Sequence, residues 1–135
     1  VYRVNWRTGT VRCQFSLRLQ PGARLMHEWR TSMPPFVASG PRFETDDEGR
    51  LVLPGHEPLK IPFGEWVRFR VECPLGNKPG RTWRLTVRMP DASEKQFTEL
   101  PVPEKFDRMG WIGFISAGST EAVFHLDDVS LEAVR

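Results

Sequence analysis

Hydrophobic and polar residues alternate with a period of two along most of this chain. The clearest case is the stretch 65–89, EWVRFRVECPLGNKPGRTWRLTVRM, in which alternating apolar residues flank the turn-rich segment PLGNKPG. Such alternation places successive side chains on opposite faces of a β-strand, and a loop rich in Gly and Pro joins strands into a hairpin. The stretch therefore predicts two antiparallel strands, each with one buried face and one face composed mostly of arginine.

The same alternation recurs in shorter segments throughout the sequence. Residues 10–20 carry apolar side chains at every second position and end at a Pro-Gly turn. Further strands are expected at 23–31, 41–46, 50–53, 95–100, 110–117 and 121–132, with weaker patterns at 1–9 and 54–65. The segments 32–40 and 101–109 are expected to be loops, the first because two consecutive prolines prevent regular pairing, the second with room for one helical turn. About ten short strands without a long amphipathic helix predict an all-β, two-sheet antiparallel sandwich.

Length, charge and composition narrow the class of protein. A chain of 135 residues can bury a core of its own and is predicted to be a single domain spanning 1–135. Its 19 basic and 17 acidic residues are too evenly balanced for a general nucleic-acid-binding protein. No apolar run approaches the ~20 residues that cross a bilayer, so no membrane insertion is expected. Because the chain begins with Val1 rather than Met, we expect a domain excised from a longer protein.

The two cysteines, Cys13 and Cys73, share the parity of their apolar neighbours and are expected to point into the core. Two buried free thiols are favoured over a disulfide between them, and the sequence alone leaves both states open. Neither a CxxC nor an HExxH motif occurs, so no zinc site is predicted.

Four motifs extend this picture: GEW at 64–66, WRLTV at 83–87, GWIGF at 110–114 and FHLDDV at 124–129. Together they resemble the concanavalin A-like lectin/glucanase superfamily, in its laminin-G-type jelly-roll branch, over residues 9–132. The resemblance implies two antiparallel sheets, one of them concave, with the first and last strands adjacent. It also implies an accessory domain of a larger bacterial protein that is extracytoplasmic or secreted.

This superfamily includes glycan-binding modules, glucanases, alginate lyases and adhesion domains, so the fold leaves the function open. Its retaining glucanases carry a Glu-x-Asp-x-x-Glu strand whose paired carboxylates act as nucleophile and acid. That spacing does not occur here, and Glu28, the nearest candidate, has no acidic residue two or five positions later. The Gln-x-His strand and Tyr/Lys pair of the lyases are also absent. We therefore expect no catalytic activity, with a glycan-cleaving enzyme as the third-ranked alternative.

Arginine side chains occupy the polar parity of three long predicted strands. They are Arg12, Arg18, Arg68, Arg70, Arg84 and Arg88. If these strands are neighbours in one sheet, the guanidinium groups form a row whose forked donors suit carboxylate or sulfate groups. This pattern predicts a site for an acidic carbohydrate. In the alternative interpretation, the arginines pair across strands with Glu72, Glu28 or Glu99 and form a solvated sheet face.

The segment HEWR at 27–30 supplies a second group of candidates. Trp29, together with His27 and Phe36, would stack on a sugar ring, and Glu28 and Arg30 flank it. Trp29 fits a core position better, as do Trp66, Trp83 and Trp111. The predicted ligand-binding residues are therefore Arg12, Glu28, Trp29, Arg30, Arg68, Arg70, Arg84 and Arg88.

Calcium is a further possibility because laminin-G-like domains sometimes bind it through loop carboxylates. The acidic clusters are 46–48 and 127–128, but a turn explains the first, and hydrogen bonds to loop amides explain Asp127. We expect no cofactor. The expected function is a non-catalytic carbohydrate-binding module, with glycans or neighbouring domains of the parent protein as partners. The alternative is a structural or protein-interaction β-sandwich without a small ligand.

Overall fold

A computed structural model describes residues 2–31, 38–118 and 122–134. The strands within these ranges are β1 (Tyr2–Trp6), β2 (Thr10–Leu19), β3 (Leu25–Arg30), β4 (Ser39–Thr45), β5 (Arg50–Val52), β6 (Leu59–Lys60), β7 (Val67–Pro74), β8 (Thr82–Arg88), β9 (Glu94–Pro101), β10 (Met109–Ser116) and β11 (Phe124–Val134). The described residues contain no helix, and the expected helical turn within 101–109 is an ordinary turn.

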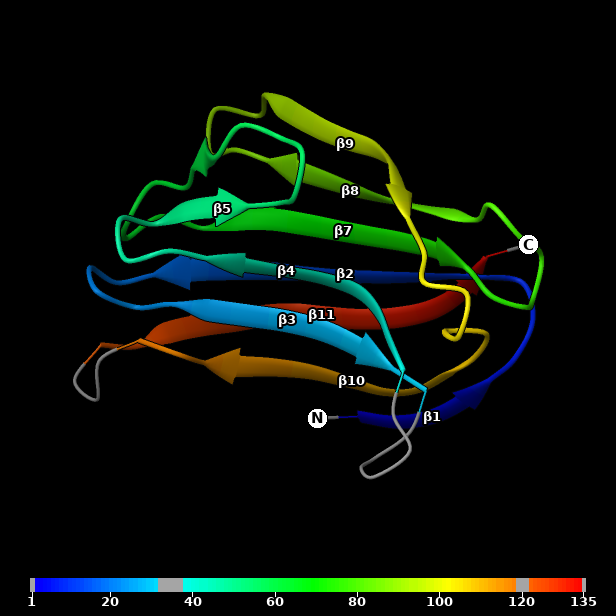
Figure 1. The fold of residues 1–135 in the computed structure, drawn as a ribbon. Coiled ribbons are helices and arrows are strands. Elements are labelled where there is room, and N and C mark those ends of the chain that lie inside the picture. The colour runs from blue at the N-terminus through cyan, green and yellow to red at the C-terminus, as the bar shows by residue number, and fades with distance from the viewer. Residues whose placement is uncertain (1, 32–37, 119–121, 135) are drawn as a thin grey trace.

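The strands form two antiparallel sheets that pack face to face (Figure 1). One sheet has the order β1-β10-β3-β4-β5-β6 and the other β11-β2-β7-β8-β9. The predicted hairpin is the β7–β8 pair, whose register sets Phe69 opposite Val87 and Val71 opposite Leu85. The last strand, β11, pairs with β2, the first long strand, whereas β1 lies beside β10 in the other sheet. The all-β, two-sheet sandwich expected from the sequence is confirmed.

The core lies between the sheets and is built from the apolar parity of each strand. In β2 and β7 buried and half-buried residues alternate along the whole strand, as the sequence pattern predicts. Phe15 of β2 and Phe69 of β7 stack with centroids 5.1 Å apart, and Phe43 of β4 stacks on Phe69 from the opposite sheet at 5.6 Å. These rings join the two sheets at the centre of the sandwich.

Cys13 and Cys73 are both buried and free, as the favoured interpretation expected. Cys13 lies opposite Val71, and Cys73 lies opposite Val11, so the two thiols occupy diagonal positions on neighbouring strands. Burial raises the pKa of both thiols to about 12. The thiols therefore stay protonated at neutral pH and behave as small apolar core groups.

His27 and Trp29 carry polar atoms into the core and satisfy them there. The Trp29 indole Nε1 donates to Nε2 of His27 at 3.0 Å, so the ring proton of His27 lies on Nδ1, which donates to the Gly113 carbonyl at 3.0 Å. Both side chains are fully buried. Trp29 is therefore a core residue, and the hypothesis that it stacks on a sugar ring was wrong. Phe36, the other aromatic group of that hypothesis, lies outside the described residues.

Two other tryptophans depart from the predicted core positions. Trp66 is 41% exposed and lies 5.0 Å from the Arg18 guanidinium, because it precedes β7 with the outward parity of Arg68. Trp111 is buried, but on the outer side of its sheet, since Ile112 takes the inward position beside Trp29. The Trp111 ring packs against Gly113, where a Cβ atom would come within 2.1 Å of the ring.

The buried His27 should make the protein sensitive to acid. Burial lowers the pKa of His27 to about 3, although its hydrogen bond to Gly113 acts in the opposite direction. Below pH ~6.5 the unfolded chain then binds a proton that the folded chain excludes. Between pH 7 and pH 5 the wild type should lose about 2 kcal/mol more free energy of unfolding than His27→Gln.

Urea denaturation at the two pH values measures this difference. The matched control is His125→Gln, which makes the same substitution at an exposed histidine. The same loss of stability on acidification in the wild type and in His27→Gln would contradict the assignment of His27 as a neutral core group.

Candidate functional site

The predicted row of arginines exists on the outer face of the five-stranded sheet. In this sheet β2, β7 and β8 are neighbours, and their apolar parity faces the core. The polar parity therefore faces outward and carries Arg12, Arg18, Arg68, Arg70, Arg84 and Arg88, which define the surface called the arginine face below. Five of the eight predicted ligand-binding residues lie on it.

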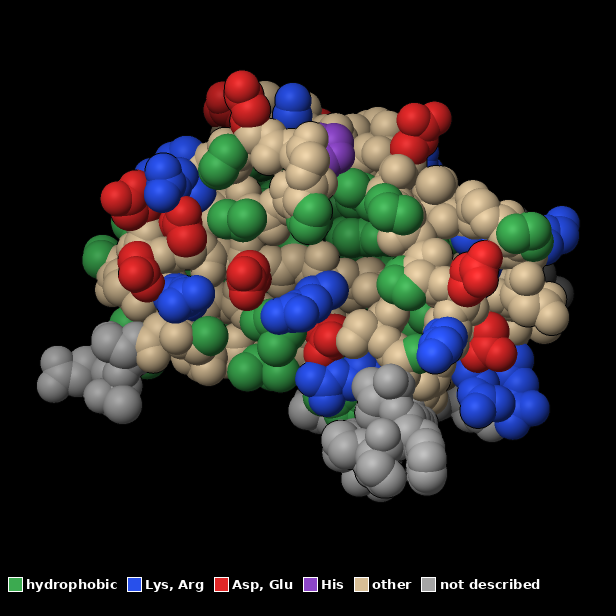
Figure 2. Space-filling model, in the orientation of Figure 1, with side chains coloured by type: hydrophobic (Ala, Val, Ile, Leu, Met, Phe, Trp, Pro, Cys, Tyr) green, Lys and Arg blue, Asp and Glu red, His purple; other side chains and the backbone are tan. Residues whose placement is uncertain are grey.

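Glu28 and Arg30 lie on the opposite side of the molecule. They belong to β3 of the six-stranded sheet and point away from the core, because Trp29 between them points inward. Figure 2 views the molecule from this side and shows basic and acidic side chains interspersed among apolar ones. The predicted residues therefore divide between two faces, with Trp29 in the core, and do not form one site.

Glu28 and Arg30 are already engaged with each other and with their neighbours. The Glu28 side chain is only 5% exposed; its Oε1 accepts from Arg30 Nε at 2.6 Å, and its Oε2 accepts from Ser39 Oγ at 2.6 Å. The Arg30 guanidinium also stacks 4.4 Å above the Trp111 ring. Both charged groups are thus fixed within their own sheet rather than paired with the arginine face.

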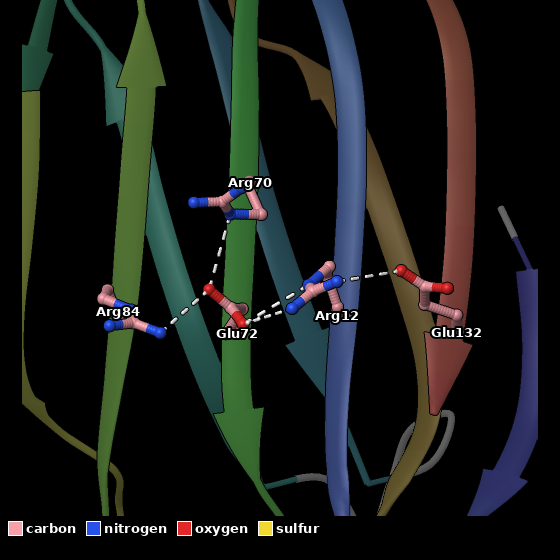
Figure 3. Close-up of polar contacts among 5 residues, drawn as sticks. All are labelled: Arg12, Arg70, Glu72, Arg84 and Glu132. Carbon is pink, nitrogen blue, oxygen red and sulfur yellow. Dashed lines mark hydrogen bonds and ion pairs between the residues drawn. The ribbon is translucent and has the colours of Figure 1, made fainter. Parts of the chain in front are cut away.

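Glu72 on β7 gathers three of the arginines on the arginine face (Figure 3). Its Oε2 accepts from Arg12 Nη2 at 3.1 Å, while its Oε1 lies 3.2 Å from Arg84 Nη2 and 3.4 Å from Arg70 Nε. Arg12 also reaches Glu132 of β11, with Nη1 3.3 Å from Oε1. The pairing expected with Glu72 is therefore present, whereas Glu99 forms no ion pair within the described residues.

The electrostatics of this network keep Glu72 ionised. Burial by itself would raise the pKa of Glu72, but the hydrogen bond from Arg12 and the charges of Arg84, Arg12 and Arg70 outweigh it and lower the pKa. In return, the hydrogen bond to Glu72 raises the pKa of Arg12. The Glu72 carboxylate is therefore a permanent counter-charge for this half of the arginine face.

Arg68 and Arg88 are left without a carboxylate partner among the described residues. They stand directly opposite each other on β7 and β8, an arrangement that is destabilising for like charges. Arg68 Nη1 donates a hydrogen bond to the Ser16 hydroxyl, at 3.3 Å. A hollow of about 100 Å³ lies at this pair, and its lining residues are Gln14, Arg68, Phe69, Arg70, Thr86, Arg88 and Glu94.

Three residues that line the hollow were not among the predicted ligand-binding residues: Gln14, Thr86 and Glu94. A signal was available for Thr86, because it shares the outward parity of Arg84 and Arg88 on the same strand. Gln14 and Glu94 reach the hollow from the neighbouring strands β2 and β9. Their proximity depends on cross-strand register, which the sequence pattern does not specify.

The acidic clusters have local roles in the backbone. Asp46 Oδ1 accepts from the amides of Glu48 and Arg50 at 3.0 and 2.9 Å, so the turn explanation of 46–48 is confirmed. Asp127 Oδ1 accepts from the Asp128 amide at 2.8 Å, beside the positive φ of 51° at Asp128. Over the described ranges, no group of three or more His, Cys, Asp or Glu is placed to hold a metal ion.

The described ranges also contain no helix with the length and hydrophobicity that a membrane span requires.

This chain is similar to known proteins in its fold. Neither a family model nor a curated protein matches the sequence. Among solved structures, the PL-14 alginate lyase from Aplysia kurodai has a TM-score of 0.64 and 10% identity, over 97% of this chain and 72% of that one. Chicken galectin 2 has a TM-score of 0.55 and 15% identity, over 97% of this chain and 95% of that one. Alginate lyase vAL-1 from Chlorella virus has a TM-score of 0.53 and 8% identity, over 94% and 72%.

These neighbours confirm the jelly-roll, concanavalin A-like β-sandwich implied by the sequence motifs. At 8–15% identity, these structures show a common fold and give no information about activity. Membership of the laminin-G-type branch stays an expectation. The site must therefore be judged on its own geometry.

Replacing Glu72 with Gln tests the network on the arginine face. The change removes the carboxylate that three guanidinium groups share, so these charges lose their common partner while staying close together. We expect the free energy of unfolding to fall by about 1–2 kcal/mol, since the carboxylate is largely buried but its partners are partly solvated. The loss should shrink at high salt, which screens the repulsion.

The matched control is Glu132→Gln. The ion pair between Glu132 and Arg12 is exposed, so its loss should cost less than ~0.5 kcal/mol. Urea denaturation of both variants at low and high salt measures the difference, and equal losses would show that Glu72 is not the centre of the network.

Proposed function

We propose that this domain is a non-catalytic carbohydrate-binding module whose arginine face receives an acidic glycan. The observation that carries the proposal is the cross-strand pair Arg68 and Arg88, two cations opposed at a hollow without a carboxylate partner among the described residues. Carboxylate and sulfate groups accept paired N–H donors from guanidinium groups. Glu94 lies opposite Arg88 on β9 but forms no ion pair with it within the described residues, so an acidic sugar would supply a counter-charge to the pair.

The fold likeness supports the carbohydrate part of this proposal. The similar structures are named as alginate lyases and a galectin, and alginate is itself an acidic polysaccharide. In the proposal the module belongs to a larger extracytoplasmic protein and binds its glycan without a metal ion or other cofactor.

The proposal that the module is non-catalytic rests on the lowered pKa of Glu72 and on the hydrogen bonds of Glu28. Retaining and inverting glycosidases need one carboxylic acid that is protonated near neutral pH beside a second carboxylate. Glu72 has the opposite character, because three guanidinium groups lower its pKa. Glu28 uses both of its oxygens to hold Arg30 and Ser39. Neither group is prepared to deliver a proton to a glycosidic oxygen.

One observation favours the alternative of a structural or protein-interaction domain. Glu72 forms ion pairs with three of the six arginines of the arginine face, as expected for a solvated sheet surface. In this alternative Arg68 and Arg88 are charges that keep the sheet face soluble. The two functions differ in whether an acidic glycan binds at this pair.

The test compares three forms of the protein by isothermal titration calorimetry. The ligands are oligouronates, sulfated oligosaccharides and neutral oligosaccharides, at low and physiological salt. We expect the wild type to bind acidic ligands, more weakly at physiological salt because surface charges are screened. The double variant Arg68→Gln/Arg88→Gln should lose at least about tenfold in affinity, or ~1.4 kcal/mol.

The control is Arg42→Gln, which removes an exposed arginine from the opposite sheet and should leave affinity unchanged. Loss of binding in Arg42→Gln alone would indicate that the glycan binds to the six-stranded sheet. In that sheet the buried Nε1 of Trp111 has no hydrogen-bond partner within the described chain. A folded wild type that binds no glycan at either salt concentration would favour the interaction-domain alternative.

A further inference from the structure

We propose that the hollow at Arg68 and Arg88 is a subsite for a single oxyanion, the carboxylate or sulfate group of a sugar. In this subsite the hydroxyl of Thr86 lies at the base of the hollow and donates a hydrogen bond to the oxyanion. This inference rests on the proposed function and deepens it, because it assigns the acidic group of the glycan to one place on the arginine face. The sugar ring itself would lie outside the hollow, over the sheet.

Thr86 is the observation from which the subsite is inferred. The residue is only 4% exposed, and its Oγ1 is buried without a hydrogen-bond partner in the described part of the chain. Its outward parity on β8 places it opposite Arg70 and among the residues that line the hollow. A buried hydroxyl without a partner costs free energy, whereas valine would have the same shape and an equal preference for a strand. Folding alone therefore gives no reason for the hydroxyl.

The guanidinium groups around Thr86 have N–H donors that are not used in hydrogen bonds within the described structure. Arg70 is held by one ion pair of 3.4 Å to Glu72, and its Nε makes no hydrogen bond in the described structure. Arg68 makes one hydrogen bond, to the hydroxyl of Ser16. An oxyanion above Thr86 could thus accept from the hydroxyl and from guanidinium N–H groups of β7. Such charge-assisted hydrogen bonds are the stronger class.

The size and rim of the hollow limit what can enter. Its volume of about 100 Å³ suits one oxyanion group, since pockets that enclose whole small-molecule ligands measure about 300–1,000 Å³. Glu94 faces Arg88 across the rim, where it disfavours further negative charge and can accept a hydrogen bond from a sugar hydroxyl. Gln14 lines the hollow from β2 and offers an uncharged amide. This arrangement favours an acidic sugar over a free multivalent anion.

The decisive variant is Thr86→Val, because it separates stability from binding. Removing a hydroxyl without a partner should raise the melting temperature of the protein. The same change should lower the affinity for an acidic oligosaccharide by about ten- to a hundredfold, the equivalent of one hydrogen bond to a charged group. Thr86→Ser retains the hydroxyl and should keep the affinity close to that of the wild type.

The matched control is Thr82→Val on the same strand. Thr82 is exposed and lies outside the hollow, so this variant should bind like the wild type. Calorimetry with glucuronate, a sulfated monosaccharide and glucose identifies the source of the oxyanion. Competition by either acidic sugar, but not by glucose, supports the subsite.

Three results would overturn the inference. Unchanged affinity in Thr86→Val, in a protein whose binding is lost in Arg68→Gln/Arg88→Gln, would refute the subsite and leave the proposed function standing. Equal competition by glucose and glucuronate would also refute it. A wild type that binds no acidic glycan would refute the proposed function and the subsite together.

Discussion

The packing of two apolar sheet faces against each other is the constraint on which the rest of this molecule depends. Phe15, Phe69 and Phe43 stack across the interface between the sheets, so the strands that carry them are fixed in register. Side chains alternate along a strand, and a slip by one residue would therefore exchange its two faces. Once the phenylalanines are buried, the intervening arginines of β2 and β7 must point outward. The arginine face is thus a consequence of core packing.

The arginine face divides into two electrostatic environments. Around Glu72, three guanidinium groups share one carboxylate whose pKa they lower, so each of these arginines has an ion-pair partner within the sheet. At the other half, Arg68 and Arg88 oppose each other beside a buried hydroxyl without a partner. Natural proteins tend to satisfy buried polar groups and to avoid opposed like charges. A region that breaks both rules is where an external partner is expected to complete the structure.

On the opposite sheet, the charged groups of Glu28 and Arg30 pair with each other. Glu28 accepts hydrogen bonds from Arg30 and Ser39 at 2.6 Å, and the Trp111 ring packs against Gly113 beneath the Arg30 guanidinium. Beneath this surface, His27 and Trp29 pair within the core. One short segment, HEWR, therefore contributes alternately to the core and to the outer surface. This explains why its aromatic and charged residues do not act together as one ligand site.

The sequence by itself determined the two-sheet β class, most strands, the β7–β8 hairpin and the outward position of the arginines. These features follow from an alternation of period two that is readable within one strand. Only the tertiary structure decided which groups meet. Arg12 and Glu72 are 60 residues apart in the chain, and Arg12 and Glu132 are 120 apart. The isolation of the Thr86 hydroxyl depends in the same way on cross-strand register, which is set by the packing of distant segments and not by any local pattern.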